Sequence, residues 1–259
     1  MGAVVISVAL QKGGVGKTAT SLNLSAELGL RKKRVLLIDL DSQANSTYSS
    51  GQNVNELEYS VYNVLTPDKE YHCNIEQAIL KCKYYDLLPA DSAVNDLVLE
   101  LKDFHALKNV LEQVKDKYDF IILDCPPAIS MVTANAFVAS DKVIIPTECK
   151  AYSFLGILEL KKNIDEIKAT LNPELEVLGI LLVKYDKRAL VTMQMQEMIE
   201  NVSSQLNTTV YSYTIRNRIA VEESALNQIP LCDYKGSNKD AYIDYRGFVT
   251  ETLKRLEIK

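Results

Sequence analysis

Residues 4 to 19 read VVISVALQKGGVGKTA and constrain the fold more than any other stretch of the chain. Branched apolar residues, typical of a buried strand, precede a glycine-rich turn and then a helical apolar pattern. Glycines let a backbone turn tightly around phosphate oxygens, and the amides at a helix start face an anion with the positive end of the helix dipole. The stretch therefore predicts a strand, a phosphate-binding loop and a helix that together bind a nucleoside triphosphate.

Two residues of this loop have direct chemical roles. Lys17 would neutralise the β and γ phosphates, and the Thr18 hydroxyl would ligate Mg²⁺. Gln11 stands where the general pattern of such loops has glycine, while Lys12 adds a second lysine where one is sufficient. We expect the nucleotide to contact Lys12, Gly13, Gly14, Val15, Gly16, Lys17, Thr18 and Ala19.

Two more apolar runs end in aspartate. Val35 to Asp39 is followed by Asp41, and Phe120 to Leu123 leads into Asp124, the expected second Mg²⁺ anchor. Such runs are typical of strands buried on both faces of a parallel sheet, which bind ligands at their carboxyl ends. We predict an α/β fold with a doubly wound, mostly parallel sheet flanked by helices, in one P-loop NTPase domain over residues 1–259. A simple strand-ending turn of Asp and Ser is the alternative around Asp41.

Three motifs in this order, QKGGVGKT, LLIDLDSQAN and FIILDCPP, resemble those of the ParA/Soj family of deviant Walker A ATPases, which partition plasmids and chromosomes. The resemblance implies ATP and Mg²⁺ as cofactors, and hydrolysis of ATP to ADP and phosphate with weak intrinsic activity. Asp41 would position the attacking water, and Asp39 would support Mg²⁺ through its water shell. The implied catalytic residues are Lys12, Lys17 and Asp41, and the implied metal site is Thr18, Asp39 and Asp124.

The second lysine of the loop suggests a dimer. In the family this lysine contacts the nucleotide of a facing subunit, as an arginine finger supplied in trans does, so ATP binding would drive homodimerisation. A solvated surface lysine is the alternative interpretation of Lys12. Two positions depart from the family pattern, because Ala19 replaces a threonine that would bind the α-phosphate and Ser42 replaces a proline after Asp41. Glu148 and Tyr152 are weaker candidates for the dimer face.

The net charge of −5 means that any DNA contact must come from a local basic patch. The family resemblance implies an ATP-bound dimer that binds DNA without sequence preference and a ParB-like partner that supplies site recognition. No helix-turn-helix module is expected before the phosphate loop. Solvated loop charges are the alternative for each basic candidate, and the candidates are Arg216, Arg218, Lys184, Lys187 and Arg188.

A MinD-like ATPase that cycles on a membrane, or a cargo-positioning ATPase, is the alternative function. Residues Tyr242 to Leu256 predict a packed helix of the domain, where a membrane-cycling relative would need a basic amphipathic helix. No stretch predicts a signal peptide or a membrane span, so we expect a cytoplasmic, nucleoid-associated protein with no membrane partner.

Some weaker patterns also yield predictions. In a helix over Lys17 to Leu30, Leu22, Ala26 and Leu30 would form the inner face. Asn74 to Lys81 could be a helix, and Thr209 to Tyr213 would be a last strand. The stretch from Pro230 to Leu253 resembles the family's nucleotide-edge loop and final helix.

Overall fold

The computed structural model describes residues 2–236 and 239–258. Within them, one seven-stranded sheet has the order β3-β4-β2-β5-β1-β6-β7, and neighbouring strands are parallel except for β3 and β4. This confirms the predicted doubly wound, mostly parallel sheet. The strands are β1 Val4–Val8, β2 Val35–Asp39, β3 Leu80–Lys81, β4 Asp86–Leu88, β5 Phe120–Asp124, β6 Lys142–Glu148 and β7 Glu176–Val183.

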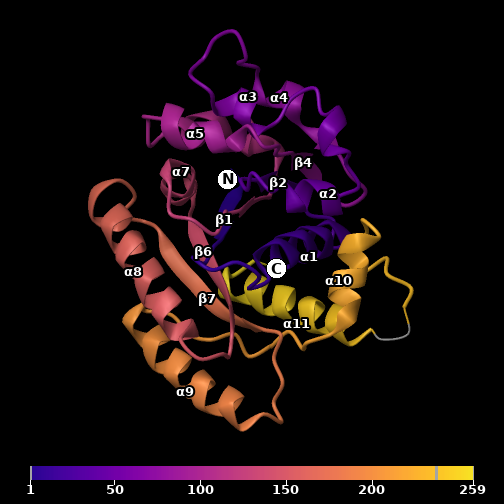
Figure 1. The fold of residues 1–259 in the computed structure, drawn as a ribbon, viewed down its shortest axis with the longest axis vertical. Helices are drawn as coiled ribbons and strands as arrows, with labels where there is room; N and C mark the ends of the chain where they lie inside the picture. Colours follow the sequence, from indigo (N-terminus) through magenta and orange to yellow (C-terminus); the bar gives the residue numbers. More distant parts are fainter. Residues whose placement is uncertain (1, 237–238, 259) are drawn as a thin grey trace.

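Helices cover both faces of the sheet (Figure 1). One face packs on α1 and α11, which contact each other, so segments near the two ends of the chain lie side by side. The other face packs on α3 to α9. The helices are α1 Lys17–Leu30, α2 Asn45–Ser49, α3 Val61–Leu65, α4 Ile75–Ala78, α5 Val94–Glu100, α6 Ala106–Glu112, α7 Met131–Ala139, α8 Ser153–Thr170, α9 Leu190–Gln205, α10 Ile219–Leu226 and α11 Asp240–Arg255.

The central strands bring the predicted site residues to one edge of the sheet. All five residues of β2 and of β5 are buried, as the continuous apolar runs predict. In the parallel register, Asp124 on β5 lies opposite Asp39 on β2 and opposite Val8 on β1. The phosphate loop leaves β1 at this same edge, so the loop and both aspartates converge as predicted.

The predicted last strand at Thr209 to Tyr213 is wrong. In this region the described chain makes only isolated parallel bridges, one between Ile180 of β7 and Val210 and one between Tyr185, two residues after β7, and Arg216. The amides of Ser212 and Tyr213 instead donate to the Glu251 carboxylate, at 2.9 and 3.3 Å. The side chain of Glu251 therefore takes the hydrogen bonds that a continuous ladder would need.

Two smaller predictions are also corrected. The helix predicted over Asn74 to Lys81 ends at Ala78, and Leu80 and Lys81 pair with β4 as an antiparallel edge strand. Leu30 is 41% exposed because it is the last residue of α1, whereas Leu22 and Ala26 are buried as predicted. Every helix in residues 2–236 and 239–258 is too short or too polar to cross a membrane.

Candidate nucleotide-binding site

The phosphate loop connects β1 to α1 through two left-handed glycines. Gly14 and Gly16 have φ angles of 73° and 75°, values that any residue with a Cβ adopts only with strain. The first helical hydrogen bond runs from the Thr20 amide to the Gly16 carbonyl at 2.9 Å. The amides at the start of α1 are therefore left to face an anion, as the sequence predicts.

Lys17 lies inside this loop. Its ammonium donates to the Lys12 carbonyl at 3.0 Å, and only 7% of the residue is exposed. Burial lowers the pKa of Lys17, while the negative charges of Asp124 and Asp41 oppose that change. The Lys17 ammonium is thus a buried cation that the phosphate groups of a bound nucleotide would neutralise.

Lys12 lies differently from Lys17. Its side chain is exposed, and the residue is absent from the lining of the adjacent cleft. Its backbone carbonyl is the part of Lys12 that belongs to the loop's internal hydrogen bonding. The side chain of Lys12 is therefore accessible to solvent beside the loop.

Asp39 and Asp124 are fully buried neighbours across β2 and β5. Burial, together with the charge of Asp124, raises the pKa of Asp39 to about 7. Burial also raises the pKa of Asp124, against hydrogen bonds from Ser46, Thr18 and Ser21 and the charge of Lys17. Two neighbouring carboxyl groups in a buried site do not readily ionise together, because their like charges repel. Such a pair therefore holds a proton or a cation between the two groups.

Hydroxyl groups that the sequence did not single out hold these carboxylates. Asp124 accepts from the Ser21 hydroxyl at 3.0 Å and from the Ser46 hydroxyl at 2.7 Å. Asp39 accepts from both the amide and the hydroxyl of Thr47, each at 2.8 Å. Ser46 and Thr47 lie on α2, directly after the LLIDLDSQAN motif. Their nearness to Asp41 in the sequence is the only signal that would have pointed to them.

Asp41 lies half-buried at the mouth of the site. Its amide donates to Asp39 at 3.1 Å, and its carboxylate accepts from the Gln43 amide at 3.0 Å. Because Asp39 and Gln43 fix the turn on either side of Asp41, the turn is ordered although Ser42 replaces the family's proline. Its carboxylate lines the cleft beside the phosphate loop.

The cleft has a volume of about 470 Å³, a usual size for a small-ligand site. Its polar end holds Gly13, Gly14, Gly16, Lys17, Thr18 and Asp41. Its more apolar end includes residues from α1, α10 and the following loop, among them Leu22, Val221, Ala225, Ile229 and Pro230. Nothing in the sequence had pointed to α10.

The loop after α10 is held by hydrogen bonds to two other parts of the chain. Asn23 of α1 accepts from the Leu231 amide at 3.0 Å. Asp233 binds the Lys83 ammonium and the Tyr84 hydroxyl, both at 2.8 Å. Ile229 and Pro230, just before these ties, line the cleft, as expected for an edge loop. Ser237 and Asn238, which also belong to the predicted edge loop, lie outside the described residues.

The predicted DNA contacts lie in two settings. Arg216 binds Asp244 through two nitrogens, at 2.8 and 2.7 Å, and Arg218 binds Asp240 at 2.9 Å. Arg216 and Arg218 also line a small cavity beside Gly16. Both arginines are thus positioned by carboxylates close to the start of α1.

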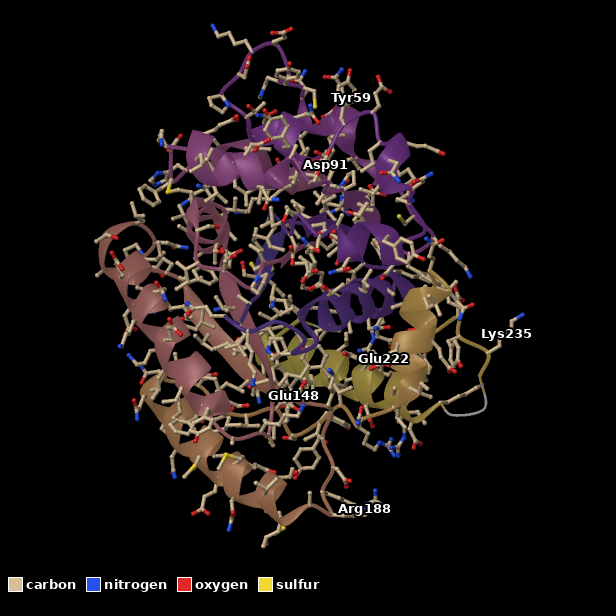
Figure 2. All side chains as sticks on the ribbon, viewed as in Figure 1. Tyr59, Asp91, Glu148, Arg188, Glu222 and Lys235 are labelled. Carbon is tan, nitrogen blue, oxygen red and sulfur yellow. The ribbon has the colours of Figure 1, made fainter. Side chains whose placement is uncertain are left out.

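The other three candidates follow β7. Arg188 is paired with Asp186 at 3.1 Å, yet its side chain is 85% exposed. Figure 2 shows Arg188 at the outer end of the loop before α9, away from Glu148 and Glu222. Lys187 is also exposed. Lys184 turns toward the phosphate loop instead, where it meets Gly14 and Glu148.

Comparison with known proteins agrees with this geometry. The model of the AAA domain family matches residues 3–177. An uncharacterized protein of Pseudomonas putida is 43% identical over 263 residues, covering 98% of this chain and 95% of that protein. The sporulation initiation inhibitor protein Soj of Bacillus subtilis is 35% identical over 246 residues, covering 93% of this chain and 95% of Soj.

Solved structures show the same fold. The cobyrinic acid a,c-diamide synthase of Mycobacterium smegmatis, crystallised with ADP and magnesium, has a TM-score of 0.82 at 28% identity and covers 98% of this chain and 96% of its own. The cell division ATPase MinD of Pyrococcus furiosus has a TM-score of 0.77 at 24% identity, covering 99% and 100%, and shares the fold. From the match to the family model and the identity to Soj, this chain belongs to the ParA/Soj family of P-loop ATPases.

Proposed function

We propose that this chain is an ATPase of DNA partition, acting as one unit over its 259 residues, that dimerises on binding ATP and binds DNA without sequence preference as the dimer. The observation that carries the proposal is a cleft lined by the phosphate loop, Lys17 and Asp41, with the buried Asp39–Asp124 pair at the same edge of the sheet. The relationship to Soj supports partition as the process.

The residues at this edge fit a magnesium nucleotide. Mg²⁺ is bound through few carboxylates and keeps several waters, and the buried Asp39 and Asp124 beside Thr18 offer such a donor set. Thr18 would hold the ion directly, with Asp124 and Asp39 behind it. The bound ion would supply charge neutralisation for the transferring phosphoryl group.

The protein's own groups account for the remaining catalytic requirements. Lys17 and the loop amides would stabilise charge on the phosphate oxygens. Asp41, fixed by its neighbours at the cleft mouth, would orient the attacking water in line with the scissile bond. Among the described residues that line the cleft, the cationic side chains are Lys17 and Lys184, and Lys184 is paired with Gly14 and Glu148, so a cation for the outer face of the γ-phosphate would have to come from elsewhere. We expect weak intrinsic turnover that a ParB-like partner stimulates.

The exposed Lys12 would supply that missing cation to the nucleotide of a facing subunit. Sedimentation velocity with a non-hydrolysable ATP analogue tests this part of the proposal. The wild type should sediment as a dimer, and Lys12→Ala as a monomer with slower turnover. Lys69→Ala is a matched control, because Lys69 is also exposed but lies in the loop after α3. A full dimer with normal turnover in Lys12→Ala would refute the role of Lys12.

Arg216, Arg218, Lys187 and Arg188 are the proposed DNA contacts, and the protein would associate with the nucleoid through them. Pelleting with plasmid DNA and flotation with anionic liposomes, each with and without ATP, separate this function from membrane cycling. Binding to liposomes in place of DNA would favour the MinD-like alternative.

A further inference from the structure

Lys184 directly follows β7 and lies beside the phosphate loop, in an unusual backbone conformation. Its φ angle is 50°, in the left-handed region that lysine rarely adopts. The next amide, of Tyr185, donates to the Ile215 carbonyl at 2.9 Å and so holds the chain in this turn. Residues kept in such conformations often have a functional reason. Here the turn directs the lysine side chain back over the phosphate loop.

The Lys184 ammonium joins two groups. It donates to the Gly14 carbonyl at 2.9 Å, and it lies 3.3 Å from a carboxylate oxygen of Glu148. The Glu148 side chain is only 7% exposed, at the end of β6, where it is opposite Val183 of β7. Lys150 pairs with the same carboxylate from an exposed position. A nearly buried carboxylate is destabilised when a cationic partner is removed, because its charge is then left uncompensated. The ion pair with Glu148 therefore holds the Lys184 side chain in place.

The Gly14 carbonyl belongs to a part of the loop that side-chain packing does not hold. Gly14 is exposed, has a positive φ, and a Cβ there would meet nothing within 4 Å, so packing does not hold it. A glycine is also the residue with the most backbone freedom. The peptide unit is planar, with the Gly14 C=O and the Val15 N–H pointing to opposite sides. Fixing the carbonyl oxygen therefore fixes the direction of the Val15 amide.

From this geometry we infer that Lys184 is a positioning residue, anchored by Glu148, that holds the Gly14–Val15 peptide of the phosphate loop in its nucleotide-receiving orientation. The inference rests on the proposed nucleotide binding and adds a residue outside the loop motif to it. It also reassigns Lys184, which the sequence had placed among the DNA contacts. If Lys184 positions the phosphate loop, its mutation should weaken nucleotide binding. If Lys184 contacts DNA, its mutation should weaken DNA binding.

The first experiment uses the full chain without nucleotide. Hydrogen exchange of the loop amides should be roughly five- to tenfold faster in Lys184→Met, as expected for loss of one partly exposed hydrogen bond of ordinary strength, and near wild type in Lys184→Arg, which restores the donor. Glu148→Gln, which weakens the anchor, should change exchange in the same direction as Lys184→Met. Lys150→Met is the matched control, since it removes a charge from the same carboxylate and leaves the bond to Gly14 in place.

The second experiment measures ATP turnover and DNA binding in the same variants. KM for ATP should rise roughly five- to tenfold in Lys184→Met with less than a twofold change in kcat, and the salt dependence of DNA binding should stay unchanged. Unchanged loop exchange and KM, with a shallower salt dependence, would overturn the inference and make Lys184 a DNA contact. If the wild type failed to bind nucleotide, the proposed function would fail, while the exchange data would still report on the contact with Gly14.

Discussion

The buried pair of Asp39 and Asp124 predicts an unusual pH dependence of stability in the metal-free protein. We propose Asp39→Asn as the perturbation, because asparagine is neutral at every pH and keeps an oxygen that can accept from Thr47. The pKa of Asp39 rises from 3.8 to about 7 on folding. Each unit of pKa corresponds to about 1.4 kcal/mol. The full effect is therefore on the order of 4 kcal/mol.

The sign follows from which state holds the proton. Below about pH 4 Asp39 is protonated in both states, and above about pH 7 it is ionised in both. Between these values the folded protein keeps a proton that the unfolded chain has lost, so the free energy of unfolding falls as the pH rises. The variant lacks the titration of Asp39 and therefore lacks this part of the fall. Asp39→Asn should therefore gain stability relative to the wild type as the pH rises from 4 to 7.

Urea unfolding between pH 4.5 and pH 8, in EDTA, measures this difference. Asp119→Asn is a control in which the pKa shift has the opposite sign. The hydrogen bond from Arg34 holds the pKa of Asp119 below the ordinary value of 3.8. Its stability difference from the wild type should be constant above pH 5. A constant difference for Asp39→Asn across the whole range would show that the two carboxyl groups do not share a proton, and would refute the reasoning.

Two further predictions concern how α1 and the edge loop are held. In a urea titration, Gly29→Ala should destabilise the fold by roughly 1–3 kcal/mol, because a Cβ would lie 1.9 Å from the Tyr84 carbonyl oxygen. Gly156→Ala in α8 is the control and should be neutral or stabilising, because a Cβ there meets only Leu10, at 3.8 Å. Equal effects of the two substitutions would contradict the close packing of α1. Asp233→Asn should speed release of a fluorescent ADP analogue several-fold in stopped flow, because it weakens the ties from Lys83 and Tyr84 that hold the cleft-lining loop; an unchanged release rate would show that these ties do not act on the nucleotide.

The sequence predicts the framework of the site well, because the patterns that define it lie in short stretches of neighbouring residues. Strand, glycine turn and helix follow one another within residues 4–30, and each later aspartate ends an apolar run, so position along the chain determines position in the sheet. Asp39 and Asp124 meet because parallel register places the ends of β2 and β5 side by side. These predictions needed no knowledge of side-chain contacts.

The missed features depend on contacts between distant parts of the chain. Ser46 binds a carboxylate 78 residues away, and the Glu251 carboxylate takes the amides of the segment that was predicted as a last strand. The sequence places Lys184 among the DNA contacts because it follows a strand among other basic residues, whereas the inferred positioning role rests on a distant contact. Its contact with Gly14, 170 residues earlier in the chain, comes from a left-handed turn that no local pattern announces.

DNA binding as a function of nucleotide state tests the central claim most directly. Binding of a nonspecific duplex should require ATP or a non-hydrolysable analogue and be absent with ADP. Lys17→Ala should lose it, and Asp41→Ala, which should bind ATP without hydrolysing it, should keep it. If about three phosphates are neutralised per protomer, log K should fall with log salt at a slope near −2.7 per protomer. Equal binding in all nucleotide states, or a flat salt dependence, would contradict an ATP-switched DNA-binding dimer.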